Sequence, residues 1–266
     1  MVFSSFTFLF YFLPAFLLVY FLAPASCKNA VLFAASLIFY YNGVKEHPYY
    51  MILILLSVAV NDVAARGIAR CEKKRGRRMW LAVGMTWNIG SLFVFKYLGF
   101  VMGIVGVGGM ELPLPIGISF YTFQAMSYVI DVYRRKVKAE NPFYVGLYIS
   151  FFPQLIAGPI IQYNVISEQL RSRKTDFSLF SLGISRFTVG LGKKVLLANS
   201  FAAIADHVFE WSAIGAERMA VPVMLAWLGS IAYSLQIYYD FSGYSDMAIG
   251  LGRMFGFHYK ENFNYP

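Results

Sequence analysis

The chain contains few residues of the types that build disulfide frameworks, metal centres or charged surfaces. Two of its 266 residues are cysteine, three are histidine, and 14% carry a charge. Cys27 and Cys71 lie beside basic residues, and their spacing does not match a metal-ligand pattern. We therefore expect no disulfide, no metal and no bound cofactor.

Apolar residues are abundant instead. They make up 58% of the chain, 18% of the chain is aromatic, and apolar runs recur along its whole length, which excludes an ordinary soluble domain. The pattern predicts an all-α polytopic integral membrane protein with one transmembrane domain over 1–266. A spanning helix needs about 20 apolar residues. The candidate segments are 3–23, 29–42, 48–65, 79–109, 112–130, 143–161, 179–209 and 219–252.

Basic residues gather in the short loops between these segments. A net charge of +9 would also suit a nucleic-acid partner, but this distribution is the one that orients membrane helices, so we expect none. The loop Arg66–Arg78 contains seven basic residues and one acid, which predicts a cytosolic position. Counting spans back from this loop places the N-terminus outside.

Two regions do not fit a simple succession of straight spans. Segment 143–161 is interrupted by Pro153, Gly158 and Pro159 and is followed by another basic loop, which predicts a re-entrant hairpin that lines a cavity. Lys193 and Lys194 divide 179–209, and 219–252 would be roughly 50 Å long as one helix. Broken or strongly tilted helices are therefore expected in both.

The last apolar segment contains two carboxylates and no basic residue between Arg218 and Arg253. Asp240 and Asp246 each cost roughly 2.5–3.5 kcal/mol at a bilayer centre, which indicates an intramembrane polar site. Helical spacing places several polar residues on two neighbouring stripes. The candidate tunnel-lining residues are Gln236, Tyr239, Asp240, Ser242, Tyr244 and Asp246. A hydrogen-bond network between helices, with no substrate, is the alternative.

Two further stretches carry polar groups in apolar surroundings. The prolines of L-P-L-P predict the start of a helix that carries Ser119, Tyr121 and Gln124, residues suited to a polar or acyl group. Ordinary membrane-helix architecture explains this stretch equally well. In F-F-P-Q-L-I-A-G-P-I, Gln154 would be buried and would need a partner.

Four motifs together resemble the membrane-bound O-acyltransferase family, in particular its alginate O-acetyltransferase branch. They are M-V-F-S-S-F-T-F-L-F-Y-F-L-P, L-P-I-G-I-S-F-Y-T-F, F-F-P-Q-L-I-A-G-P-I and Y-Y-D-F-S-G-Y-S-D-M-A-I-G-L-G, in that order. The resemblance implies a ring of helices, with re-entrant and broken members, around a tunnel in the inner or plasma membrane.

The resemblance also implies an activity. A cytosolic acetyl thioester or acyl carrier would supply an acyl group as co-substrate, and hydroxyls of an exported, alginate-like polysaccharide would accept it. Periplasmic or extracellular acetylation proteins would be partners. D-alanyl transfer to teichoic acid, within the same family, and a non-enzymatic transporter or channel are the alternatives.

The family histidines lie in W-R-R-W-H and W-H-G types of motif, both beyond the E-N-F-N-Y-P that ends this chain. Histidine is the side chain best suited to accept the hydroxyl proton near neutral pH. His47, His207 and His258 match neither motif. We therefore expect an N-terminal portion, truncated before the C-terminal catalytic part, with no catalytic residue of its own.

The 266-residue chain, expressed alone in a strain whose polysaccharide acetylase gene is deleted, should leave the polysaccharide unacetylated, because the proton acceptor is missing. Ester-bound acetate released from the exported polysaccharide measures this. Acetylation restored to the wild-type level would refute the expectation.

Overall fold

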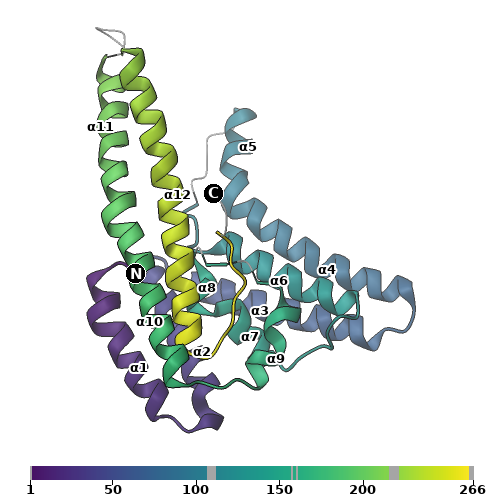
Figure 1. The fold of residues 1–266 in the computed structure, drawn as a ribbon. Coiled ribbons are helices and arrows are strands. Elements are labelled where there is room, and N and C mark those ends of the chain that lie inside the picture. Colours follow the sequence, from purple (N-terminus) through teal and green to yellow (C-terminus); the bar gives the residue numbers. More distant parts are fainter. Residues whose placement is uncertain (1, 107–111, 157, 160, 216–221, 264–266) are drawn as a thin grey trace. The chain divides into compact units, whose positions relative to one another are not determined.

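A computed structural model describes residues 2–106, 112–156, 158–159, 161–215 and 222–263 (Figure 1). All regular structure in these residues is helical, which confirms the predicted all-α class. The chain divides into two compact units. Unit 1 comprises Met1–Val2, Phe10–Ile156 and Ile160–Arg173, and unit 2 comprises Phe3–Leu9, Ala157–Pro159 and Lys174–Pro266. The single domain over 1–266 stays a prediction.

Unit 1 contains most of the shorter helices. In chain order they are α1 (Leu13–Leu22), η2 (Ala25–Cys27), α2 (Lys28–Gly43), α3 (Tyr50–Arg70), α4 (Lys74–Leu92), η3 (Phe93–Tyr97), α5 (Leu98–Ile104), α6 (Ile118–Tyr133), α7 (Pro142–Ser150), α8 (Phe152–Leu155) and α9 (Tyr163–Arg171). The π-helical turn η1 (Phe8–Phe12) precedes α1. Helices α3, α4 and α6 pack against one another.

Two buried amides hold α3 against α4. The Nδ2 of Asn88 donates to the Oδ1 of Asn61 at 2.7 Å, and the Nδ2 of Asn61 donates back at 3.2 Å. Both side chains are fully buried. An amide buried without a partner costs free energy, so this reciprocal pair favours one register of the two helices.

Three helices in the described part of the chain are long and apolar enough to cross a membrane. They are Tyr50–Arg70, Lys74–Ile104 and Phe177–Trp211, and they correspond to the predicted segments 48–65, 79–109 and 179–209. The predicted first span is represented by the shorter apolar helix Phe8–Leu22.

Unit 2 is built on two long helical rods. One rod is continuous from Phe177 to Trp211 and consists of α10 (Phe177–Gly192), the π-helical turn η4 (Lys193–Ala198) and the first part of α11 (Asn199–Gly215). The other is α12 (Val223–Met254), which lies along it (Figure 1). The predicted break at Lys193 and Lys194 was therefore wrong, because the chain forms a π-helical turn there and remains helical.

Helix α12 is likewise unbroken over its 32 residues, so the expected interruption in 219–252 was also wrong. Asp240, Ser242 and Asp246 do not interrupt it, because their side chains bind lysine and arginine side chains of the neighbouring rod. A strong tilt of this helix in the membrane stays a prediction.

The predicted interruption of segment 143–161 is present. Helix α7 ends at Ser150, Phe151 adopts a non-helical ψ of 109°, and the short α8 follows. The side chains of Phe151–Leu155 are fully buried within unit 1. Re-entry of this segment into a membrane stays a prediction.

The prolines of L-P-L-P do not start a helix, contrary to expectation. Helix α6 begins at Ile118, after Gly117, whose φ is +72°. A Cβ atom at Gly117 would lie 2.5 Å from the carbonyl oxygen of Leu155. The left-handed backbone and this close approach both require glycine, and the helix starts three residues after Pro115.

Glycines allow α10 and α12 to touch backbone to backbone. A Cβ atom at Gly190 would lie 2.6 Å from the carbonyl oxygen of Gly243, and one at Gly183 would lie 2.7 Å from that of Gly250. Because the earlier glycine of one helix meets the later glycine of the other, the helices are antiparallel. Small residues at such contacts are typical of helix packing in membranes.

Substitution of Gly190 by alanine should destabilise the purified protein by roughly 1–3 kcal/mol, because the added methyl group meets backbone atoms of α12 that cannot move aside. Gly192→Ala is the matched control, since a Cβ atom at Gly192 would meet nothing within 4 Å. The control should be neutral or stabilising by up to about 1 kcal/mol. Unfolding of both variants in detergent measures the difference, and equal effects would contradict the packing.

Candidate functional site

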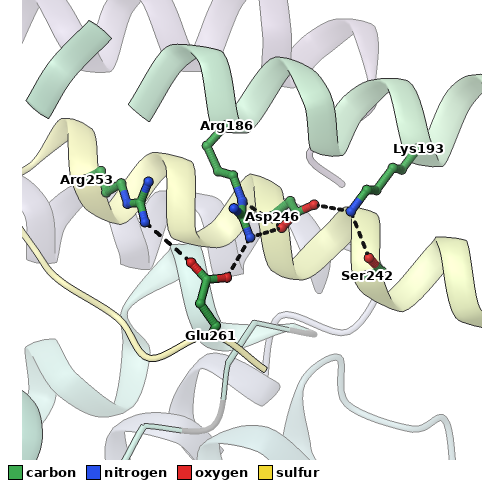
Figure 2. A network of polar contacts seen from close by, with 6 residues as sticks. All are labelled: Arg186, Lys193, Ser242, Asp246, Arg253 and Glu261. Atoms are coloured by element: carbon green, nitrogen blue, oxygen red, sulfur yellow. Dashed lines mark hydrogen bonds and ion pairs between the residues drawn. The ribbon is translucent and has the colours of Figure 1, made fainter. Parts of the chain in front are cut away.

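Asp246 of α12 is neutralised by two cations from the neighbouring rod (Figure 2). Its Oδ1 accepts from the Nε of Arg186 at 2.8 Å, and its Oδ2 accepts from the Nζ of Lys193 at 2.6 Å. The Asp246 side chain is only 4% exposed. Both oxygens of the most buried carboxylate of α12 are therefore occupied.

The network extends to both sides of Asp246, as Figure 2 shows. Lys193 also donates to the hydroxyl of Ser242 at 3.1 Å. Arg186 contacts Glu261 at 2.6 Å, and Glu261 in turn contacts Arg253 at 3.4 Å. Glu261 lies beyond the end of α12, so the network ties the chain that follows this helix back to α10.

Asp240 forms a separate ion pair with Lys194, whose Nζ lies 2.8 Å from its Oδ1. The Asp240 side chain is 39% exposed and therefore much less enclosed than that of Asp246. Consecutive residues of an α-helix point about 100° apart. The π-helical turn that begins at Lys193 widens the helix here, and the two adjacent lysines reach two different aspartates of α12.

The remaining candidates on α12 have separate surroundings. Tyr239 stacks on Phe201 with ring centroids 5.9 Å apart, and Tyr244 stacks on Phe3 at 4.5 Å. Within the described residues, the Oε1 of Gln236 and the hydroxyl of Tyr244 are buried without a hydrogen-bond partner. Gln236, Asp240 and Tyr244, which helical spacing places on one stripe, therefore each have different surroundings. A tunnel along this stripe stays a prediction.

The candidates in unit 1 lie on α6 and α8. Tyr121 is buried with its ring edge toward Tyr40 at 6.4 Å, whereas Ser119 is partly exposed. Gln154 donates from Nε2 to the carbonyl oxygen of Tyr148 at 3.0 Å, which is the partner that its burial required. The Oε1 atoms of Gln124 and Gln154 accept no hydrogen bond from the described residues.

The three histidines have separate surroundings. His47 lies in the turn before α3, where the rings of Tyr49 and Tyr50 are 5.6 and 5.8 Å away. His207 and His258 are exposed. The expectation of no catalytic residue stays a prediction. No group of three or more metal-ligating side chains occurs among the described residues.

The partners of the two aspartates were not identified from the sequence, although a signal was present. Gly183, Arg186, Gly190 and Lys193 recur at helical spacing and share one face of α10. On α12, Gly243, Asp246 and Gly250 do the same. Two faces that combine small residues with opposite charges predict a helix pair.

A match to a family model decides the classification. Residues 86–266 match the model of the membrane-bound O-acyltransferase family. The chain belongs to this family. Other members of the family are membrane proteins, and the long apolar helices agree with a membrane location for this chain.

Named relatives match over the whole chain. Identity is 40% with the probable alginate O-acetylase of Azotobacter vinelandii and 39% with that of Pseudomonas aeruginosa, covering 54% and 52% of those proteins. Identity with the peptidoglycan O-acetyltransferase of Helicobacter pylori is 33%, covering 56% of that protein. The chain therefore spans about half the length of the curated relatives that it matches.

Replacement of Asp246 by asparagine should destabilise the protein by about 2 kcal/mol, because Arg186 and Lys193 lose the charge that neutralises them. Asp240→Asn is the matched control, since it removes the same charge from a more exposed pair and should cost below about 1 kcal/mol. Thermal unfolding in detergent compares them. A loss at Asp240 as large as that at Asp246 would contradict the assigned difference in burial.

Proposed function

We propose that the full-length protein containing this chain transfers acetyl groups to hydroxyls of an exported, alginate-like polysaccharide. The observation that carries this proposal is the identity of 38–40% with probable alginate O-acetylases over 100% of this chain. Similarity of this extent covers both units and all of the candidate residues.

A second candidate acceptor for O-acetyl transfer has support from a specific relative. Identity with a peptidoglycan O-acetyltransferase is 33% over the whole chain, which makes peptidoglycan the second candidate acceptor. Identity with the teichoic acid D-alanyltransferase of Bacillus subtilis is 28% over only 57% of the chain. An alginate-like polysaccharide is therefore the preferred acceptor, and D-alanyl transfer is disfavoured.

The proposed reaction is attack of an acceptor hydroxyl on the carbonyl carbon of an acetyl thioester. A carbon–oxygen bond forms, the carbon–sulfur bond breaks, and the hydroxyl proton passes through a general base to the leaving thiolate. The products are an acetyl ester and a free thiol. No step needs an oxidant, a reductant or a metal, since only an acyl group and a proton change places.

In this proposal, the described residues hold the helices together and position the ligand. The free acceptor atoms of Gln124 and Gln154 are buried in unit 1 and suit a hydroxyl-bearing ligand. In unit 2, the charges on Asp246 and Lys193 satisfy each other. These two residues therefore support the helices, and we assign them no proton transfer.

The proposed orientation places the Arg66–Arg78 loop in the cytosol and the N-terminus outside. A cytosolic acetyl thioester or acyl carrier then meets the basic side of the protein, and the polysaccharide is modified on the opposite side. Periplasmic or extracellular acetylation proteins are the proposed partners there.

Deletion of the gene that encodes this chain should remove acetate esters from the exported polysaccharide of the native host. Mild alkali releases ester-bound groups, so one treatment of three separated fractions distinguishes the candidates. Acetate should fall in the polysaccharide fraction, while acetate from peptidoglycan and D-alanine from teichoic acid or other wall polymers should stay constant.

Restoration of the gene should return the acetate, and a host with an empty vector is the control. Loss of acetate from peptidoglycan alone would replace the preferred acceptor by the second candidate. Loss of D-alanine alone, or no loss in any fraction, would refute O-acetyl transfer.

A further inference from the structure

A cavity of about 600 Å³ lies in unit 1, where three helices end or begin. Its wall includes the last turn of α3, the first turn of α4 and the C-terminal end of α6, together with the segment that follows α6. We call it the basic cavity. Its volume is within the range of small-molecule sites.

Four cationic side chains line the basic cavity, namely those of Arg77, Arg135, Lys136 and Lys138, and none of the lining residues is acidic. Among the described residues, none forms a hydrogen bond or an ion pair with the side chains of Arg135, Lys136 and Lys138. Arg77 donates one hydrogen bond, to the carbonyl oxygen of Tyr133. Most donors around the cavity are therefore unused.

The acids of the neighbouring helices are engaged elsewhere. Asp62 binds Arg66 at 2.8 Å, and Glu140 binds Arg171, whose pKa this carboxylate raises. Asp131 accepts from the neutral backbone amide of Asn164 at 3.3 Å and keeps its charge, and Glu72 in the loop between α3 and α4 forms no ion pair with the described residues. The four cations that line the cavity outnumber these two acids, so an anion brought into the cavity would meet an excess of positive charge.

The backbone keeps these cations together at a local cost. Arg135 has a φ of +61°, and it is the one non-glycine residue with a positive φ in the described part of the chain. This conformation is unfavourable for a residue with a side chain. It turns the chain after α6, with the amide of Lys136 donating to the carbonyl oxygen of Asp131 at 3.0 Å.

The place of the basic cavity favours a ligand at a membrane surface. Helix α3 and the continuous helix Lys74–Ile104, which begins with α4, are both long and apolar enough to span a membrane, and only residues 71–73 separate them. Their adjoining ends, and the cavity between them, therefore lie where phospholipid headgroups lie. Ile68, Val132 and Val137 add apolar surface beside the cations.

We propose that the basic cavity binds a phosphate group, carried by an anionic phospholipid headgroup or by a soluble phosphorylated ligand. Clusters of lysine and arginine beside a spanning helix attract anionic headgroups, and the planar guanidinium of arginine matches the oxygen atoms of phosphate. None of the candidate tunnel-lining or supporting residues lines this cavity, and the proposal does not depend on the proposed function.

The test uses the purified chain in neutral detergent and measures thermal protection. One arm adds phosphatidylglycerol to the micelles and compares it with an equal mole fraction of zwitterionic phosphatidylcholine. The other arm adds inorganic phosphate and compares it with chloride at equal ionic strength. The first arm reports a headgroup and the second a soluble phosphate.

The cavity variant is Arg135→Gln/Lys136→Gln/Lys138→Gln. Its side chains are exposed or partnerless, so the fold should persist, and the half-saturating concentration of the protective ligand should rise about 100-fold. The single Lys138→Gln change should raise it about fivefold. The matched control is Lys73→Gln/Arg75→Gln/Arg134→Gln, which removes the same charge from nearby exposed positions outside the cavity.

The site is supported if, in either arm, the cavity variant loses the thermal protection and the control variant keeps it. The arm in which this happens shows whether the phosphate is carried by a lipid headgroup or by a soluble ligand. Two results would overturn it. One is the absence of selective protection in both arms, and the other is an equal loss in the control variant, which would assign the effect to general surface charge.

Discussion

A charge held inside an apolar bundle must be neutralised by a neighbour, and unit 2 is organised around that requirement at Asp246. Two cations from α10 and η4 reach its carboxylate, and both do so because glycines bring the helix backbones into contact. Bulkier residues at Gly183 or Gly190 would separate the helices and lengthen these ion pairs. Packing and electrostatics therefore depend on the same few positions.

The contact between α3 and α4 in unit 1 meets the same requirement with neutral groups. The paired amides of Asn61 and Asn88 satisfy each other between two helices that are long and apolar enough to span a membrane. The Nε2 of Gln154 has a partner, whereas its Oε1 has none among the described residues. A neutral acceptor costs less free energy to bury without a partner than a carboxylate does, and both oxygens of Asp246 are occupied.

Composition and loop charge were enough to predict the helical membrane class. The apolar runs also predicted the long helices near residues 48–65, 79–109 and 179–209. The motifs led to the family, to which the chain belongs. Sequence reasoning failed where it treated polar residues as breaks. Lys193 and Lys194 were assigned to an interruption because their partners, Asp246 and Asp240, lie about 50 residues further along the chain.

Local pattern alone could not settle those positions. A lysine in an apolar run predicts a break when it is unpaired and a helix contact when it is paired, and pairing is a property of the tertiary structure. The predicted start of α6 was wrong for a similar reason. Gly117 marks it through a close approach to Leu155, and that contact is distant in sequence.

The glycine contacts between α10 and α12 also restrict how these helices can move. Sliding by one helical turn would bring a side chain against each glycine and carry Asp246 away from both cations. The pair has one allowed register, with no neighbouring arrangement of similar energy. Any motion that accompanies the working cycle of the full-length protein must therefore carry α10 and α12 together as one rigid piece, and must bend the chain elsewhere.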